Sequence, residues 1–128
     1  MRSRILCISP QRENARRIAE MLHALPLILD HAPSLQQART KLQQESYDAV
    51  LTEASLPDGN WLDVMHLVRE SPRELEVVVT DRQAEAPFWA EALNLGAYDL
   101  LPQPFYEPEV RRILYNAVSR PEHYLTAV

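Results

Sequence analysis

Short apolar runs alternate with longer amphipathic stretches along the chain. The runs lie at residues 4–8, 27–29, 49–52, 76–80 and 98–101. Some of them are almost entirely apolar, which is typical of strands that are buried on both faces of a sheet. The alternation predicts strand–helix repeats and therefore a parallel sheet covered by helices.

The stretches between and after these runs have the apolar spacing of helices. In the first, at residues 13–24, Ile18 and Leu22 share one face while Arg16 lies on the other. Further helices are expected from Ser34, after Asn60, at residues 85–95 and from Pro108. Each helix follows one of the strands, as a doubly wound α/β sheet requires.

Polar and small residues mark the expected caps and turns. Residues 34–37 fit a capping box, in which the Ser34 side chain starts the second helix. Gly96 is placed to end the fourth helix in a left-handed conformation. Gly59 lies in a turn sequence at residues 56–60, where we expect glycine because it tolerates a positive φ.

Composition indicates one globular domain. The chain has 128 residues, of which 46% are hydrophobic and 24% are charged, and this is long enough to bury a single core. Its net charge of -5 argues against a nucleic-acid-binding face. Cys7 lies in an apolar run and is expected to be a buried thiol. The apolar stretch near the N-terminus is too short for a membrane span or signal peptide, so we expect the cytoplasm.

Three segments of the sequence resemble the response-regulator receiver family. They are residues 47–59, similar to its third strand and following loop, residues 95–105, similar to its fifth strand and Lys-Pro-Phe segment, and residues 5–10, which match its first strand and acidic pair. The resemblance implies a flavodoxin-like (βα)5 fold with a five-stranded parallel sheet in the order 2-1-3-4-5. It divides the chain into a receiver-like domain, residues 1–118, and a C-terminal tail or linker stub, residues 119–128.

In this family, Mg²⁺ assists the transfer of a phosphoryl group from a phosphohistidine to one aspartate, and the resemblance places that chemistry on different residues here. The acidic pair falls on Ser9 and Pro10, the acceptor on Glu53, a metal-binding carbonyl on Ser55, the phosphoryl-binding hydroxyl on Thr80 and the lysine on Gln103. Asp81 is an alternative to Thr80, because the spacing to Gly96 is one residue longer than usual.

These replacements remove the means of phosphoryl transfer. Mg²⁺ needs near-octahedral oxygen ligation, but Pro10 has no ligand atom in its side chain and Ser9 offers only a neutral hydroxyl. Without the ion, and without a cation at Gln103, nothing neutralises the charge that develops on a transferred phosphoryl group. We therefore expect no metal, no cofactor, no catalytic residue and no enzymatic activity.

Glu53 has two interpretations. Its carboxylate extends one methylene, ~1.5 Å, beyond that of aspartate, so it could reach toward Thr80 and imitate a phosphorylated aspartate. Alternatively, it fills a relaxed pocket as a hydrated carboxylate. The usual coupling of the hydroxyl to an aromatic residue is in doubt, since Leu100 stands at the aromatic position and Tyr98, two residues earlier, is expected on the same side of the strand.

Adjacent aromatic residues mark a candidate interaction face. Phe88 and Trp89 point about 100° apart on the fourth helix, so both can hardly reach the core. The one left outside is expected either to anchor a partner or to lie flat on its own domain. The core-facing positions of this helix are expected at Ala86, Ala90, Leu93 and Ala97. The candidate face comprises Phe88, Trp89, Tyr98, Leu100 and Tyr106. In the family, the fourth helix, fifth strand and fifth helix form a common dimer or partner face.

The leading hypothesis is an atypical receiver that acts as a phosphorylation-independent protein-interaction module in two-component signalling. Its expected partners are proteins, including a second copy through the face just described and a fused or separate output domain, but not nucleic acid or membrane. One alternative is a phosphate acceptor that uses Glu53 or another acid. Another is a small-ligand sensor that uses the vacated pocket over the strand ends.

Overall fold

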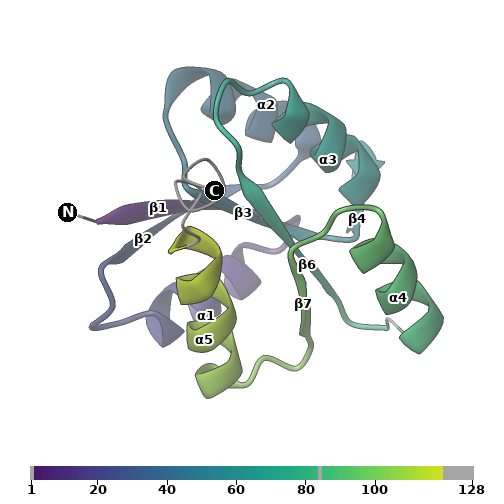
Figure 1. The fold of residues 1–128 in the computed structure, drawn as a ribbon. Helices are drawn as coiled ribbons and strands as arrows, with labels where there is room; N and C mark the ends of the chain where they lie inside the picture. The colour runs from purple at the N-terminus through teal and green to yellow at the C-terminus, as the bar shows by residue number, and fades with distance from the viewer. Residues whose placement is uncertain (1, 84, 120–128) are drawn as a thin grey trace, which may run out of the picture.

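The architecture is a parallel sheet between two layers of helices (Figure 1). The structure is a computed structural model that describes residues 2–83 and 85–119. The five-stranded sheet has the order β2-β1-β3-β6-β7. Its strands are β1 (Ser3–Ile8), β2 (Leu27–Ala32), β3 (Ala49–Glu53), β6 (Glu76–Asp81) and β7 (Asp99–Pro102). All neighbouring pairs run parallel, so the expected fold and strand order are confirmed.

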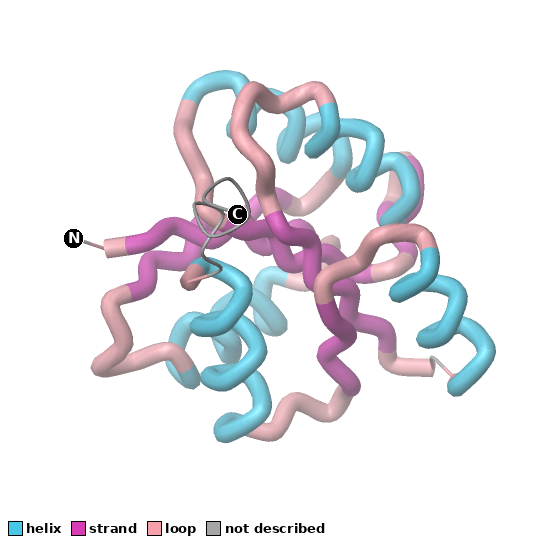
Figure 2. The backbone as a smooth tube through the Cα atoms, viewed as in Figure 1, coloured by secondary structure: helices cyan, strands magenta, loops and turns pink. Residues whose placement is uncertain are grey.

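The helices divide between the two faces of the sheet (Figure 2). They are α1 (Arg12–Met21), α2 (Leu35–Gln44), α3 (Trp61–Arg69), α4 (Ala86–Asn94) and α5 (Glu107–Val118). Helices α1 and α5 pack on one face, while α2, α3 and α4 cover the other. Within the described residues, no helix has the length and apolar content needed to cross a membrane.

Each face of the sheet has its own apolar core, and successive side chains along a strand pack alternately into the two cores. In β1, Leu6 and Ile8 join the cluster under α2, α3 and α4, whereas Ile5 and Cys7 join the one under α1 and α5. Cys7 is buried, as expected. Burial, and to a lesser extent the nearby Glu53 carboxylate, raise the pKa of its thiol to about 12, so the group stays neutral and packs as a small apolar side chain.

The loop after β3 contains an element that the pattern does not reveal. Two short strands, β4 (Ser55–Leu56) and β5 (Gly59–Asn60), form an antiparallel pair. Two-residue strands have no measurable alternation of apolar and polar positions, so the sequence indicates only a turn here. Helix α3 then starts with a reciprocal capping box between Asn60 and Asp63.

The two glycines are required for different reasons, one for its backbone conformation and the other for its small size. Gly96 has a φ of 111°, which confirms its expected left-handed position after α4. The expectation of positive φ at Gly59 is wrong, because among the described residues only Ala24 and Gly96 have positive φ. Gly59 is needed for space: a Cβ there would lie 2.6 Å from Oδ2 of Asp63 and 3.0 Å from Cδ2 of Leu35.

Helix α4 is rotated relative to its expected orientation. Ala86, Ala90 and Leu93, expected to face the core, are exposed. Ala92 is the buried residue of the helix, and Phe88 and Trp89 are partly buried against the same core. The large aromatic surfaces outweigh those of the alanines, so the helix turns its aromatic side inward and leaves Leu93 outside.

Candidate functional site

Parallel pairing brings the candidate residues together at the carboxyl edge of the sheet. Glu53 at the end of β3 is paired with Thr80 in β6, and Thr80 is paired with Leu101 in β7. Ser9 follows β1, which ends beside β3. Of the two candidates for the hydroxyl position, Thr80 has a buried side chain bonded to Gln103, while Asp81 is partly exposed.

One half of the site is a cluster around Glu53. Its Oε2 atom accepts a hydrogen bond from the Ser9 hydroxyl and another, of 3.1 Å, from the Asn14 side-chain amide. The Ser9 hydroxyl also accepts a 3.0 Å bond from the backbone N–H of Gln11. Ser9 is only 1% exposed, so its single proton must find a partner inside the protein. Two acceptors are within reach, the Glu53 carboxylate and, at 3.2 Å, the Gln11 carbonyl, and the charged carboxylate is the stronger of the two.

The backbone of Ser9 is fixed from the neighbouring strand. His31, in β2, lies with Nε2 2.8 Å from the Ser9 carbonyl oxygen. A carbonyl can only accept, so Nε2 must carry the proton. The Ser9 N–H in turn donates to the carbonyl of Ala32 over 3.0 Å. These bonds hold the Ser9 hydroxyl where Glu53 can use it.

The other half of the site joins β6 to the segment after β7. The Gln103 side-chain amide donates to the Thr80 hydroxyl over 3.1 Å, and that hydroxyl donates to the Leu101 carbonyl over 2.6 Å. Thr80 therefore uses its one proton and an acceptor position within the protein. Among the described residues, Glu53 has hydrogen bonds to Ser9 and Asn14 and none to this second cluster.

The donor set does not fit the Mg²⁺ ion of the family. Glu53 supplies one carboxylate and Ser9 a neutral hydroxyl, while Pro10 supplies no side-chain oxygen. Pro10 and Ser55 are exposed. In residues 2–83 and 85–119, no three His, Cys, Asp or Glu side chains lie close enough to hold a metal ion.

Asn14 is a member of the site that the sequence does not single out. It lies in the first turn of α1, three residues after the N-cap Gln11, and this places it over the carboxyl ends of β1 and β3. The family resemblance concerns residues at the strand ends, so it does not identify a polar residue inside a helix as part of the site. The only hint is that Asn is a poor residue for a helix interior.

Asp58, in the loop after β3, hydrogen-bonds to the start of α2. Its carboxylate accepts bonds of 2.8 Å from the Leu35 N–H and 3.0 Å from the Gln36 N–H, while Ser34 caps the same helix by accepting from Gln37. The two backbone donors hold the pKa of Asp58 below its ordinary value. The sequence predicts a turn at Asp58 but not this contact.

The residues of the candidate interaction face do not share one surface. Phe88 and Trp89 are partly buried, and the Phe88 ring meets Trp61 edge to face, with centroids 6.0 Å apart. Leu100 is 6% exposed and belongs to the core. Tyr98 lies before β7 and packs against the opposite core from Leu100, so the expectation that they share a side is wrong.

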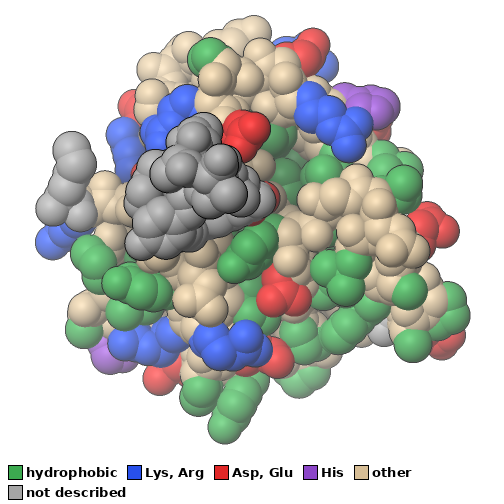
Figure 3. All heavy atoms as spheres, viewed as in Figure 1, with side chains coloured by type: hydrophobic (Ala, Val, Ile, Leu, Met, Phe, Trp, Pro, Cys, Tyr) green, Lys and Arg blue, Asp and Glu red, His purple; other side chains and the backbone are tan. Residues whose placement is uncertain are grey.

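Exposed apolar side chains lie at the end of α4 and, separately, just before α5. Leu93 is 48% exposed, Leu95 follows it at the end of α4, and Tyr106, just before α5, is 65% exposed. Figure 3 shows hydrophobic side chains over α4 and at the end of the molecule where α5 begins. These elements therefore expose some apolar surface, but mostly at residues other than those expected.

Two pockets open elsewhere on the described surface. Both lie along α2 and α3 and share Arg39, Leu67 and Glu70 among their lining residues. Neither is lined by Ser9, Glu53 or any other residue of the two hydrogen-bonded clusters. At the carboxyl edge, the side chains bind one another instead.

A family model now accounts for this architecture. The response regulator receiver domain matches residues 5–115, and the chain belongs to that family. It is a receiver domain of two-component signalling, and its relatives are regulators. Such domains interact with other proteins and often accompany output domains.

Curated relatives cover nearly all of the chain. It is 24% identical over 117 residues to the response regulator protein PilR of Pseudomonas aeruginosa, which is 91% of this chain and 26% of that protein. It is 29% identical over 123 residues to the transcriptional regulatory protein CpxR of Escherichia coli, which is 95% of this chain and 51% of that protein. The chain thus spans about a quarter and about half of the length of these two relatives.

Solved structures agree on the fold. The signal receiver domain of an HD domain-containing protein from Pseudomonas fluorescens superposes with a TM-score of 0.82 at 24% identity, covering 98% of this chain and 99% of that one. A response regulator receiver domain from Clostridium thermocellum gives 0.82 at 18% identity, covering 95% and 98%. At these identities the likeness shows the fold alone.

Proposed function

We propose that this receiver domain is a protein-interaction module that works without aspartyl phosphorylation. The observation that carries the proposal is the cluster of Ser9, Glu53 and Asn14 at the carboxyl edge of the sheet. In the family, the equivalent edge holds a metal ion and an acceptor aspartate. Here the Glu53 carboxylate accepts hydrogen bonds from two neutral donors of its own chain. We therefore propose that it stabilises the fold and does not accept a phosphoryl group.

Charge supports the same conclusion. Phosphoryl transfer depends on cations that neutralise the developing negative charge. At this edge, Gln103 is neutral and its amide is bonded to Thr80. Neither cluster contains a Lys or Arg side chain. A phosphoryl group placed here would meet the Glu53 carboxylate without a compensating positive charge, so we propose that the domain is not an enzyme.

The orientation of Glu53 argues against imitation of a phosphorylated aspartate. Imitation requires the carboxylate to engage the Thr80 hydroxyl, but that hydroxyl is bonded to Gln103 and to the Leu101 carbonyl. Glu53 is directed instead toward Ser9 and Asn14. We therefore prefer a fixed conformation of the site over a built-in active state.

The proposed partners are proteins, in the cytoplasm. A second copy would bind through the face of α4, β7 and α5, where Leu93 and Tyr106 expose apolar surface. An output domain, fused or separate, is the other proposed partner. The net charge of -5 makes nucleic acid an unfavourable partner for this domain, and the proposal includes no contact with membrane.

Incubation with acetyl phosphate and Mg²⁺, followed by intact mass spectrometry, tests the proposal. We expect no covalent change, because the edge lacks both the metal ligands and the cation. A stable species heavier by about 80 Da, the mass of one phosphoryl group, would support the phosphate-acceptor alternative instead.

A restored variant is the matched control. Ser9→Asp, Pro10→Asp, Glu53→Asp and Gln103→Lys together rebuild the acidic pair, the acceptor and the cation of the family. We expect this variant to gain the phosphoryl adduct in the same incubation, with circular dichroism to verify that it is folded. Its modification would show that the four positions, rather than the rest of the fold, decide the chemistry.

A further inference from the structure

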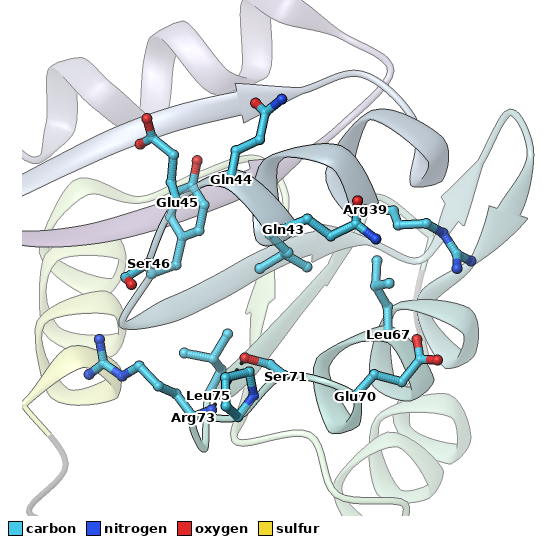
Figure 4. Close-up of a pocket in the computed structure, with 13 residues that line it drawn as sticks. Arg39, Gln43, Gln44, Glu45, Ser46, Leu67, Glu70, Ser71, Arg73 and Leu75 are labelled. Carbon is cyan, nitrogen blue, oxygen red and sulfur yellow. Dashed lines mark hydrogen bonds between the residues drawn. The ribbon is translucent and has the colours of Figure 1, made fainter.

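A groove lies along α2 and α3, and one of its pockets is drawn in Figure 4. No residue of the two hydrogen-bonded clusters lines it. One end opens between the loops that follow the two helices, with a volume of about 480 Å³. It adjoins a second recess of about 400 Å³ between the helices themselves, through the shared residues Arg39, Leu67 and Glu70. The helices and their loops thus form one continuous groove.

The floor of the groove is apolar. Leu42 from α2, Leu67 from α3 and Leu75 before β6 line it, and all three belong to or pack against the core under these helices. An apolar side chain bound here would extend that core and remove its own surface from water. Gln43 and Ser46 at the rim offer neutral hydrogen-bonding groups of the kind that pair with a peptide backbone.

The charged side chains at the groove fall into two groups. Glu45 is paired with Arg4 over 2.6 Å, and Arg73 is paired with Asp48 over 3.0 Å.

Arg39 and Glu70 are different, because both are exposed and neither has an ion pair or side-chain hydrogen bond among the described residues. In Figure 4 they lie on either side of Leu67. Arg69, which lines the second recess, is likewise exposed and has no ion pair or side-chain hydrogen bond among the described residues. The groove therefore presents two unpaired cations, Arg39 and Arg69, and one unpaired anion, Glu70, beside an apolar floor.

We propose that this groove binds an extended segment of a partner protein. The segment places one apolar side chain on the floor and carries an acidic residue for Arg39 and a basic residue for Glu70. A concave recess of about 480 Å³ suits an extended chain better than the convex surface of a folded domain, and the opposite charges of Arg39 and Glu70 set the direction in which the chain lies. The inference does not depend on whether the carboxyl edge is phosphorylated.

A random heptapeptide library displayed on phage, selected on the full 128-residue chain, tests the proposal. The counter-selection uses the double variant Arg39→Glu/Glu70→Arg, which keeps both charges but exchanges them. Both positions are exposed and unpaired, so we expect this variant to fold normally. We expect enrichment of peptides that carry an apolar residue together with one acidic and one basic residue.

The synthetic form of an enriched peptide then measures the charge pairing. Arg39→Glu or Glu70→Arg alone should weaken binding about tenfold. The double variant should recover binding to the same peptide with its acidic and basic residues exchanged. Leu62→Glu, an exposed position on α3 that does not line the groove, should leave the affinity unchanged.

Four results would overturn the proposal. The first is that no peptide is enriched, and the second is that neither charge reversal changes the affinity. The third is that a synthetic peptide of residues 120–128 binds in preference to the selected peptides. The fourth is that the chain self-associates and that the same charge reversals abolish this association. The third would make the occupant this chain's own segment, and the fourth would make it a second copy.

Discussion

In the function proposed here, a few single side chains distinguish this protein from a phosphate acceptor. The sequence suffices to locate Ser9, Glu53, Thr80 and Gln103, because each ends or follows a strand and the resemblance aligns them. It does not predict which of them bind one another. Glu53 could reach toward either neighbouring strand, and in the structure it is bonded to Ser9 and to Asn14, whose position comes from the packing of α1 rather than from any motif.

The buried hydroxyl of Ser9 should contribute to stability. Ser9→Ala removes a donor to the partly buried Glu53 carboxylate, and we expect a loss of about 1–2 kcal/mol in the free energy of unfolding by urea. Ser55→Ala is the matched control, since Ser55 is exposed and should change stability by no more than about 0.5 kcal/mol. Equal effects of the two substitutions would argue against the cluster.

Removing the charge of Glu53 distinguishes the two interpretations of this residue. Glu53→Gln keeps the length of the side chain but makes it neutral. We expect the amide signals of Ser9 and Asn14 to shift in nuclear magnetic resonance spectra, while those of Thr80 and Gln103 change little. Large shifts confined to Thr80 and Gln103 would instead favour imitation of a phosphorylated aspartate.

Among the elements, the strands and helices follow from apolar periodicity, while caps and short loops do not. The pattern places all five strands of the large sheet, but it gives the wrong inward face for α4, because it counts alanines and ignores the larger surfaces of Phe88 and Trp89. The β4–β5 pair is too short to have a pattern. Its position is fixed in part by contacts distant in sequence, from Asp58 to Leu35 and Gln36 of α2.

Asp58 makes the α2 cap dependent on pH. Its pKa is below the ordinary 3.8 because the N–H groups of Leu35 and Gln36 stabilise the charged form. The contribution to stability is therefore complete above pH 3.8 and is lost as the pH falls through the lower pKa of the folded state. We expect Asp58→Ala to lower the urea midpoint at pH 7, with the difference from wild type shrinking below pH 3.8.

The control for this pH dependence is Glu74→Ala. Glu74 is exposed and caps no helix, so its removal should leave the midpoint unchanged across the same range. A difference between Asp58→Ala and wild type that stays constant down to pH 2 would contradict a role for the ionised carboxylate.

We expect substitution of Gly59 to destabilise the protein because it displaces Asp63, and not because it strains the backbone of residue 59. In Gly59→Ala, the new Cβ would displace the Asp63 carboxylate that closes the α3 capping box, and we expect a loss of about 1 kcal/mol. In an Asp63→Ala background the same substitution should cost clearly less. Equal costs in the two backgrounds, measured by urea unfolding, would point to another cause.

At the scale of the whole molecule, the chain has the fold of a receiver domain, but the residues at the carboxyl edge of its sheet differ from those of the family. The side chains at the carboxyl edge are hydrogen-bonded to one another, whereas the exposed apolar residues of α4 and the groove between α2 and α3 are the surfaces that we propose for partners. The fold was predictable because the strand–helix repeats cover the chain. The groove was not, since its lining comes from two helices and two loops that no motif connects.

The apolar face should support self-association. We expect sedimentation velocity to detect a dimer that grows with concentration and that Leu93→Arg weakens. Leu62→Arg, at a position on α3 that is 37% exposed, is the matched control and should leave the dimer intact. A monomer at every concentration, or equal effects of the two substitutions, would exclude this face as a dimer interface.

Titration with Mg²⁺ is the most direct test of the central claim that a hydrogen-bonded cluster has replaced the metal site. Amide signals of Ser9, Glu53 and Ser55 would be followed by nuclear magnetic resonance as MgCl₂ is added. We expect no saturable shift at these residues, because one carboxylate and one neutral hydroxyl do not bind the ion. Saturating shifts at these three residues, with one ion bound per chain, would contradict the claim.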